Sequence, residues 1–189
     1  CIPDQPEGVH SPALEALAAP KVEALARSFK DKDMILISCA DDPGIERARA
    51  AVRNVPITGA GECTAALAAR YGRSIAVIGI TDQAPKAFRR MLVPETKPHA
   101  QTASAALLGN FRPDGVHSTL DLQTPEGRRS CLAAAKHVRD LGADVIALGC
   151  TGMATIGIAR EMEAETGIPV IDPVLAMGAF AAFEAARRA

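Results

Sequence analysis

The sequence lacks any strong excess of charge, any long apolar run and any paired-cysteine motif. Its formal net charge is -1 and no cluster of Lys and Arg stands out, so no nucleic-acid-binding surface is predicted. Apolar segments such as residues 74–81 are too short to cross a bilayer, and residues 1–8 do not resemble a signal peptide. We therefore expect no membrane partner and a cytoplasmic location.

The cysteines also exclude some classes of protein. None forms a Cys-x-x-Cys pair, and none has a histidine nearby at the spacing of metal ligands. The four histidines lie far apart in the chain. The five cysteines are Cys1, Cys39, Cys63, Cys131 and Cys150. An odd, scattered set of this kind predicts reduced thiols rather than disulfides or a metal site.

Apolar runs alternate with Ala-rich stretches of helical period. With 189 residues, of which 48% are hydrophobic and 23% charged, the chain can bury a sizeable core in one domain or two small lobes. The alternation is typical of parallel α/β proteins. Expected strands are 34–40, 55–61, 74–81, 115–122 (a weaker candidate), 144–150 and 168–174, and expected helices are 41–54, 62–72, 82–92, 125–142, 155–167 and 175–189. Asp42 is a candidate cap for the first of these helices.

A repeat lies within this order. Residues 34–61 and 144–174 share an apolar strand, a cysteine, a turn, a helix and a further strand with a Val-Pro or Ile-Pro pair. Cys39 precedes that proline by 17 positions and Cys150 by 19. We interpret the repeat as two similar lobes related by a pseudo-twofold axis. Because ligands bind beyond the carboxyl ends of parallel strands, both cysteines should face one cleft, from strands that are central in their sheets.

Three short motifs stand out in the sequence: Cys-x-Asp-Asp-Pro-Gly at 39–44, Gly-x-Gly-Glu at 59–62 and Gly-Cys-Thr-Gly-Met at 149–153. Together they resemble motifs of the aspartate/glutamate/hydantoin racemase superfamily, and most closely those of its hydantoin racemase branch. The resemblance covers nearly the whole chain and implies a pair of α/β lobes with the active site between them. It also implies a racemase without cofactor, in which Cys39 and Cys150 are the catalytic acid and base.

The sequence departs from that family at its start. Members that it resembles begin with a strand ending in Asn-Pro-Asn, a helix and a second strand, whereas the stretch 1–15 here starts at the end of that second strand. We therefore expect the first lobe to lack its opening strands in this chain. The expected division is a first lobe at 1–72, a second lobe at 73–172, and a C-terminal helix at 173–189 that packs back on the first lobe.

Two thiols suit proton transfer at a carbon next to a carbonyl group. One thiolate removes the proton while a thiol on the opposite face supplies another, and the roles reverse for the other enantiomer. Cys39 and Cys150 both precede predicted helices, whose N-terminal N–H groups should lower the thiol pKa. Asp41 and Asp42 should act against this at Cys39, because nearby carboxylates disfavour a thiolate.

Seven further positions near the two cysteines are candidate substrate contacts. A helix cap or turn is an equal alternative for the residues at 81 and 151–152, and Glu62 could instead complement a helix dipole. Gly59 could be a turn former, and Cys63 and Cys131 are more simply small core residues. The seven candidates are Ala40, Asp41, Gly59, Glu62, Thr81, Thr151 and Gly152.

The sequence thus predicts an isomerase that racemises a small molecule without metal, pyridoxal phosphate or nucleotide. A hydantoin or a related five-membered ureide is the expected substrate. The dicarboxylic branch typically has Cys-Asn-Thr at its first cysteine and Cys-Thr-Glu or Cys-Thr-His at its second, where this chain has Cys-Ala-Asp and Cys-Thr-Gly. The alternatives are an aspartate- or glutamate-type racemase and a non-catalytic small-molecule-binding or redox-sensing protein, and assembly into a homo-oligomer is left open.

Overall fold

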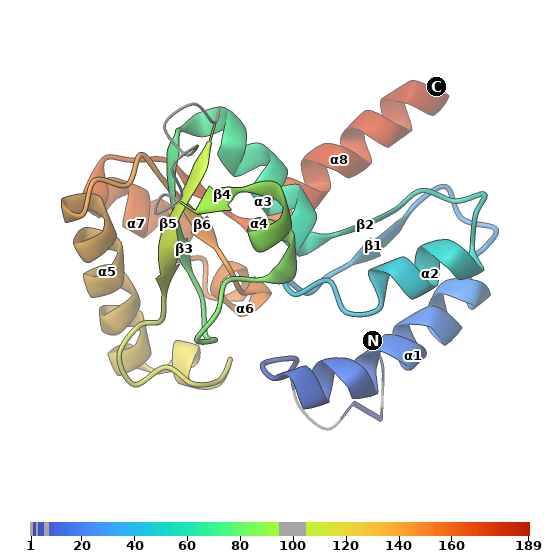
Figure 1. Ribbon diagram of the computed structural model, residues 1–189, viewed down its shortest axis with the longest axis horizontal. Helices are drawn as coiled ribbons and strands as arrows, with labels where there is room; N and C mark the ends of the chain where they lie inside the picture. Colours follow the sequence, from blue (N-terminus) through green and yellow to red (C-terminus); the bar gives the residue numbers. More distant parts are fainter. Residues whose placement is uncertain (1, 3, 6–7, 95–104) are drawn as a thin grey trace.

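Two parallel sheets and their flanking helices make up the protein (Figure 1). The computed structural model describes residues 2, 4–5, 8–94 and 105–189. The first sheet pairs β1 (Ile35–Ile37) with β2 (Ile57–Gly59), and the second has five strands in the order β4-β5-β3-β6-β7. These five are β3 (Ser74–Ile78), β4 (Val93–Pro94), β5 (Ala106–Phe111), β6 (Val145–Leu148) and β7 (Val170–Ile171). All pairings are parallel, so the prediction of a parallel α/β fold is confirmed.

Two helices pack together beside the first sheet (Figure 1). They are α1 (Pro12–Ser28) and α2 (Ile45–Ala51), and they share a small core with both strands. The patterns considered above do not predict α1. Its start nevertheless carries a local signal, because the hydroxyl of Ser11 accepts a hydrogen bond from the Leu14 N–H at 3.3 Å and proline occupies the first helical position.

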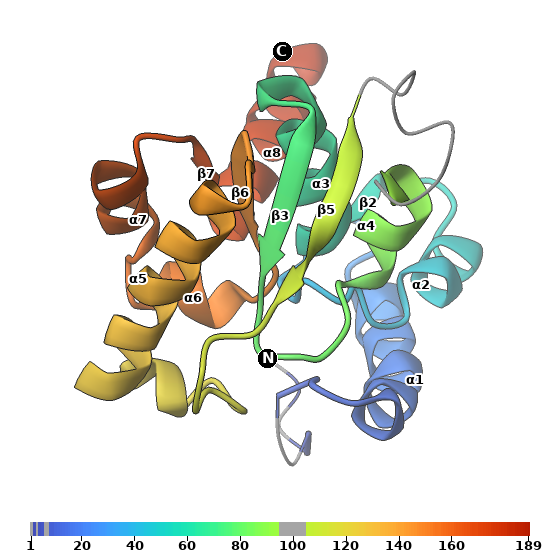
Figure 2. The same cartoon turned by 60° about the vertical axis from the view of Figure 1, so that its left-hand side comes forward.

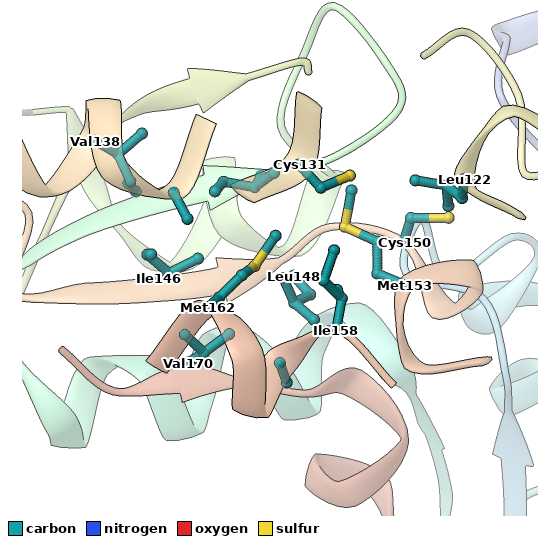
Figure 3. Close-up of a cluster of buried hydrophobic side chains, with 14 of the residues drawn as sticks. Leu122, Cys131, Val138, Ile146, Leu148, Cys150, Met153, Ile158, Met162 and Val170 are labelled. Atoms are coloured by element: carbon teal, nitrogen blue, oxygen red, sulfur yellow. The ribbon is translucent and has the colours of Figure 1, made fainter. Parts of the chain in front are cut away.

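The second sheet is the middle layer of a three-layer arrangement. Every residue of 75–78 in β3 and of 145–148 in β6 is fully buried. Alternate side chains on these strands point to opposite faces. One face packs against α5 (Pro125–Asp140) and α7 (Ala159–Thr166), in the core shown in Figure 3. The other packs against α3 (Ala60–Tyr71), α4 (Lys86–Met91) and α8 (Pro173–Arg188), as Figure 2 shows from another side.

Helices α3 and α8 pack against the second sheet and also reach the neighbourhood of the first. α3 follows β2 directly, and it contacts α8, α4 and β6. α8 buries Ala176 and Met177 in the core beside α3, and Arg188 near its end forms an ion pair with Asp33, just before β1. The predicted boundaries after residues 72 and 172 and the pseudo-twofold relation stay predictions. None of the described helices is long and apolar enough to cross a membrane.

One predicted strand is wrong, and two observed strands, β4 and β5, were missed. Residues 115–122 form turns and a short 3-10 helix, η2 (Asp121–Gln123), rather than a strand. The carboxylate of Asp121 accepts hydrogen bonds from the N–H groups of His117 (2.9 Å) and Ser118 (2.8 Å), which favours a turn over extended chain. The strand that pairs with β3 on the side away from β6 is instead β5, earlier in the chain.

The two strands that lead to the cysteines are placed differently in their sheets. β6, before Cys150, lies between β3 and β7, as expected. β1, before Cys39, pairs only with β2 among the described residues, so the expectation that it is central is wrong. The sheet next to Cys39 therefore has two strands where the other has five, which agrees with the expectation of fewer strands in the first lobe.

Candidate active site

Cys39 and Cys150 each lie just beyond the carboxyl end of a parallel strand. Cys39 comes two residues after β1, at the start of a turn closed by a hydrogen bond from the Asp42 N–H to the Cys39 carbonyl oxygen (3.0 Å). Cys150 comes two residues after β6 and is the N-terminal cap of the short helix α6 (Thr151–Thr155). The repeat seen in the sequence thus has an equivalent place for both cysteines.

The two cysteines line one cavity of about 640 Å³. Its wall includes the turn after β1, the segments after β3 and β6, and one side of α1. A volume of this size suits a small organic ligand. The geometric expectation that both cysteines face one cleft is therefore met, while their catalytic roles stay a prediction. Both are free thiols, as are Cys63 and Cys131.

The candidate substrate contacts divide into two groups. Ala40, Asp41, Thr81 and Thr151 line the cavity beside the cysteines. Gly59, Glu62 and Gly152 do not line it. The N–H of Gly152 points to the Cys150 sulfur, while Gly59 and Glu62 belong to a polar network behind the Cys39 turn. The contacts of these residues with a substrate remain predictions.

Burial dominates the acid–base properties of both thiols. It raises the pKa of Cys39 from 9.0 to about 12, helped by the charges of Asp41, Cys150 and Asp42 and opposed by a hydrogen bond from the Asp41 N–H. It also raises the pKa of Cys150, against hydrogen bonds from the N–H groups of Gly152 and Met153. The helix N-terminus therefore acts in the predicted direction, but the expectation of a lowered thiol pKa is wrong because desolvation is the larger effect.

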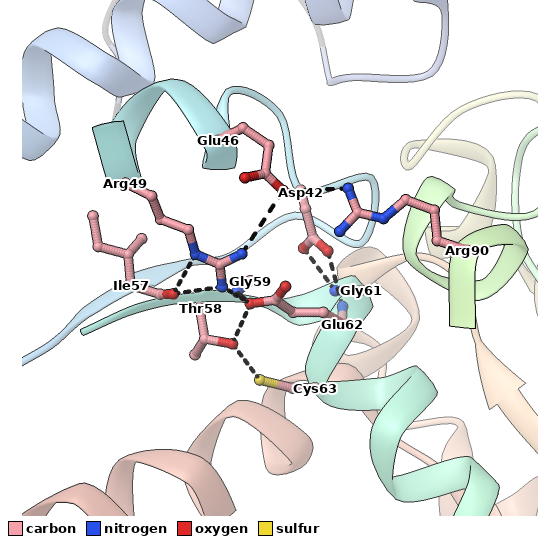
Figure 4. Close-up of polar contacts among 10 residues, drawn as sticks. All are labelled: Asp42, Glu46, Arg49, Ile57, Thr58, Gly59, Gly61, Glu62, Cys63 and Arg90. Carbon is pink, nitrogen blue, oxygen red and sulfur yellow. Dashed lines mark hydrogen bonds and ion pairs between the residues drawn. The ribbon is translucent and has the colours of Figure 1, made fainter. Parts of the chain in front are cut away.

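Asp42 caps a different helix from the one predicted. Helix α2 begins at Ile45 with Gly44 at its cap position and no side-chain cap. The Asp42 carboxylate instead accepts hydrogen bonds from the N–H groups of Gly61 and Glu62, at 2.8 Å each, in the first turn of α3 (Figure 4). Burial raises the pKa of this carboxyl to about 7, although the two N–H groups oppose the rise.

Glu62 holds β2 and α2 together rather than facing the cavity. Its carboxylate accepts hydrogen bonds from the Thr58 hydroxyl (2.7 Å) and from the guanidinium of Arg49, which also donates to the carbonyl oxygen of Ile57 (Figure 4). Thr58 in turn contacts the sulfur of Cys63 at 3.2 Å. Cys63 is fully buried, as expected of a small core residue.

Several cavity residues were not found by sequence reasoning. Ser38 and Ile80 adjoin the candidate residues Cys39 and Thr81, whereas Thr119, Gln5 and α1 had no signal that linked them to the cysteines. The side-chain amide of Gln5 is buried, and neither its nitrogen nor its oxygen has a hydrogen-bond partner among the described residues. A buried amide of this kind is available to a ligand. No group of three or more metal-ligating side chains occurs within the described ranges.

Two curated proteins of similar sequence are hydantoin racemases. A hydantoin racemase from Paenarthrobacter aurescens is 30% identical over 159 residues, which cover 81% of this chain and 62% of that protein. A hydantoin racemase from Pseudomonas sp. (strain NS671) is 28% identical over 153 residues, covering 79% of this chain and 57% of that protein. The chain thus spans less than two thirds of the length of these two relatives.

Solved structures support the fold. An allantoin racemase from Klebsiella pneumoniae superimposes with a TM-score of 0.66 at 24% identity, covering 89% of this chain and 66% of that one. A glutamate racemase from Francisella tularensis gives 0.64 at 15% identity, covering 97% and 68%. The sequence profile described as Asp/Glu/Hydantoin racemase matches residues 1–181. The chain therefore belongs to the Asp/Glu/Hydantoin racemase family.

Proposed function

We propose that this protein is a cofactor-independent racemase in which Cys39 and Cys150 are the acid and the base. The observation that carries the proposal is that the two thiols follow strands of different sheets and line the same cavity. A substrate carbon held between them would meet one sulfur on each face. Inversion at that carbon needs a base on one face and an acid on the other, which two thiols can supply in either order.

The proton balance of this reaction is simple. The thiolate takes the proton from a carbon next to a carbonyl group, and the electron pair moves onto the carbonyl oxygen as an enolate. The opposite thiol then returns a proton to the other face and becomes the thiolate for the reverse reaction. Because burial raises the pKa of both thiols, the thiolate is a strong base once it forms.

The lining of the cavity supports a neutral substrate. Among the described residues that line it there is no Lys, Arg or His, and its single charged side chain is the carboxylate of Asp41. A dicarboxylate would bring anionic groups into a wall without cations. A hydantoin or related ureide instead presents adjacent N–H and C=O groups, which match the donor and acceptor of the Gln5 amide, a group without a partner in the described part of the chain. The names of the relatives, hydantoin racemase and allantoin racemase, agree with this substrate class.

Deuterium exchange tests the two-thiol mechanism. In heavy water, Cys39→Ser and Cys150→Ser should each abolish racemisation and exchange deuterium into one enantiomer only, of opposite hand in the two variants, because a single base remains on one face. The double variant should lose both exchanges. The substrates tested are hydantoins, aspartate and glutamate, and NMR measures the deuterium taken up by each.

Cys63→Ala is the matched control, since this thiol is buried in the core and does not line the cavity. It should leave both exchanges largely intact. Normal racemisation by either serine variant would contradict the mechanism. Exchange with aspartate or glutamate but with no hydantoin would contradict the substrate class and favour the dicarboxylic alternative.

A further inference from the structure

The turn that carries Cys39 is held in an unusual backbone conformation. Asp42 closes this turn through its N–H, and its φ of 50° makes it the one non-glycine residue with positive φ in the described part of the chain. Asp and Asn tolerate this region better than most residues, yet it persists only where the surroundings stabilise it. Asp42 is 8% exposed, so those surroundings are protein.

The Asp42 carboxylate supplies that stabilisation across a long stretch of sequence. Its two oxygens accept hydrogen bonds from the N–H groups of Gly61 and Glu62, one each at 2.8 Å (Figure 4). These N–H groups belong to the first turn of α3 and have no partner within the helix. The turn after β1 is thereby fastened to the helix that follows β2.

Two glycines leave the space that this contact needs. A Cβ atom at Gly59 would lie 2.0 Å from Oδ1 of Asp42. A Cβ atom at Gly61 would lie 2.1 Å from the carbonyl oxygen of Ala40 and 2.7 Å from Oδ2 of Asp42. Neither glycine lines the cavity. The missing side chains of the Gly-x-Gly motif therefore make room for the Cys39 turn rather than for a ligand.

We propose that Asp42 is a positioning residue for Cys39, whose carboxylate fastens the turn to α3 so that the thiol stays directed into the cavity. The inference rests on the proposed function and extends it. Cys39 needs such support more than Cys150 does, because β1 pairs only with β2 among the described residues whereas β6 is held on both sides. Asp42 itself does not line the cavity and acts through the turn.

Two substitutions separate the effect of the carboxylate from the effect of the positive φ at position 42. Asp42→Asn suits positive φ but places an amide NH₂ against one of the two N–H groups of α3. Asp42→Gly suits positive φ and removes both acceptors. Asp144→Asn is a matched control, since Asp144 Oδ2 also accepts two backbone hydrogen bonds, from the N–H groups of Arg73 (3.1 Å) and Ser74 (3.0 Å), at the opposite end of the second sheet.

The variants are made in two backgrounds that isolate one thiol each. In Cys150→Ser, deuterium exchange into a hydantoin depends on Cys39, and both Asp42 variants should lower its kcat about tenfold or more with little change in KM. In Cys39→Ser, exchange depends on Cys150 and should stay within about twofold. Asp144→Asn should leave both exchanges within that range, and urea unfolding checks that the variants are folded. Equal losses in both backgrounds, or no loss in either, would overturn the proposal.

A second measurement does not depend on enzymatic activity. The rate at which each thiol reacts with an aromatic disulfide reagent is measured residue by residue with peptide mass spectrometry, in the chain with all its cysteines. Loosening the turn should expose Cys39 and speed its reaction at least about fivefold, while Cys150 changes less than about twofold. If no ureide exchanges deuterium in any background, the proposed function fails. The change in the Cys39 reaction rate relative to that of Cys150 then decides the role of Asp42 by itself. Unchanged reactivity of Cys39 in both Asp42 variants would overturn the positioning role of Asp42.

Discussion

Cys39 should react slowly with thiol reagents at neutral pH, and its reaction rate should rise steeply with pH. Burial is the main cause that raises its pKa from 9.0 to about 12, and this rise lowers the fraction of thiolate at neutral pH about a thousandfold. A more basic thiolate is also a better nucleophile, and a Brønsted slope of about 0.4–0.5 recovers roughly 15- to 30-fold. Native Cys39 should therefore react roughly 30 to 60 times more slowly with an aromatic disulfide than a thiol of ordinary pKa.

The change of the Cys39 reaction rate with pH reports the thiol pKa more directly than the absolute rate does. Between about pH 6 and 11 the native Cys39 rate should rise about tenfold for each pH unit, because the thiolate fraction does so well below the pKa. The reaction rate of the same cysteine in the urea-unfolded chain should level off near its ordinary pKa of 9.0. Steric burial slows the native reaction at every pH but leaves the slope unchanged. A native rate that levels off below about pH 9 would refute the claim that burial controls this thiol.

Other parts of the structure yield further predictions. Because burial raises the pKa of Asp42 to about 7, its ionisation opposes folding, and the wild-type free energy of unfolding relative to Asp42→Asn should fall by up to about 1.4 kcal/mol per pH unit from about pH 4 to 7. Urea unfolding at each pH measures this difference, and a constant value contradicts it. Phe88→Ala, at a fully buried site, should cost about 3–5 kcal/mol in urea unfolding, whereas Phe183→Ala, 68% exposed, should stay within about 0.5 kcal/mol. Gln5→Leu should raise KM for a hydantoin about tenfold with little change in kcat, and an unchanged KM would remove Gln5 from the substrate contacts.

The best predictions from sequence concern the strands of the second sheet. β3 and β6 are continuous apolar runs because both of their faces are buried, and that composition is readable without a structure. β5 was missed since it contains Gly109 and Asn110, residue types that are depleted in strands. The segment 115–122 has apolar residues at 116, 120 and 122, but it folds around the Asp121 carboxylate, whose hydrogen bonds to backbone N–H groups favour a turn.

The site was predictable where it depends on chain order and unpredictable where it depends on distant contacts. The repeat around Cys39 and Cys150 predicted that both thiols share a cavity, because each follows the carboxyl end of a parallel strand, where ligands bind. The cap formed by Asp42 joins residues 19 and 20 positions apart, and local propensity favoured the nearer helix. The raised thiol pKa values follow from burial, which sequence alone does not quantify.

The outer edge of β1 has a consequence for handling the protein in solution. A strand whose second edge has no partner, as holds for β1 within the described residues, offers its free N–H and C=O groups to any extended segment that reaches it. Leu36 in the same strand is 40% exposed, which adds an apolar contact to such an encounter. Strand addition between molecules would cover the rim next to Cys39, so activity per molecule should decline as protein concentration rises, and assays of this chain belong at high dilution.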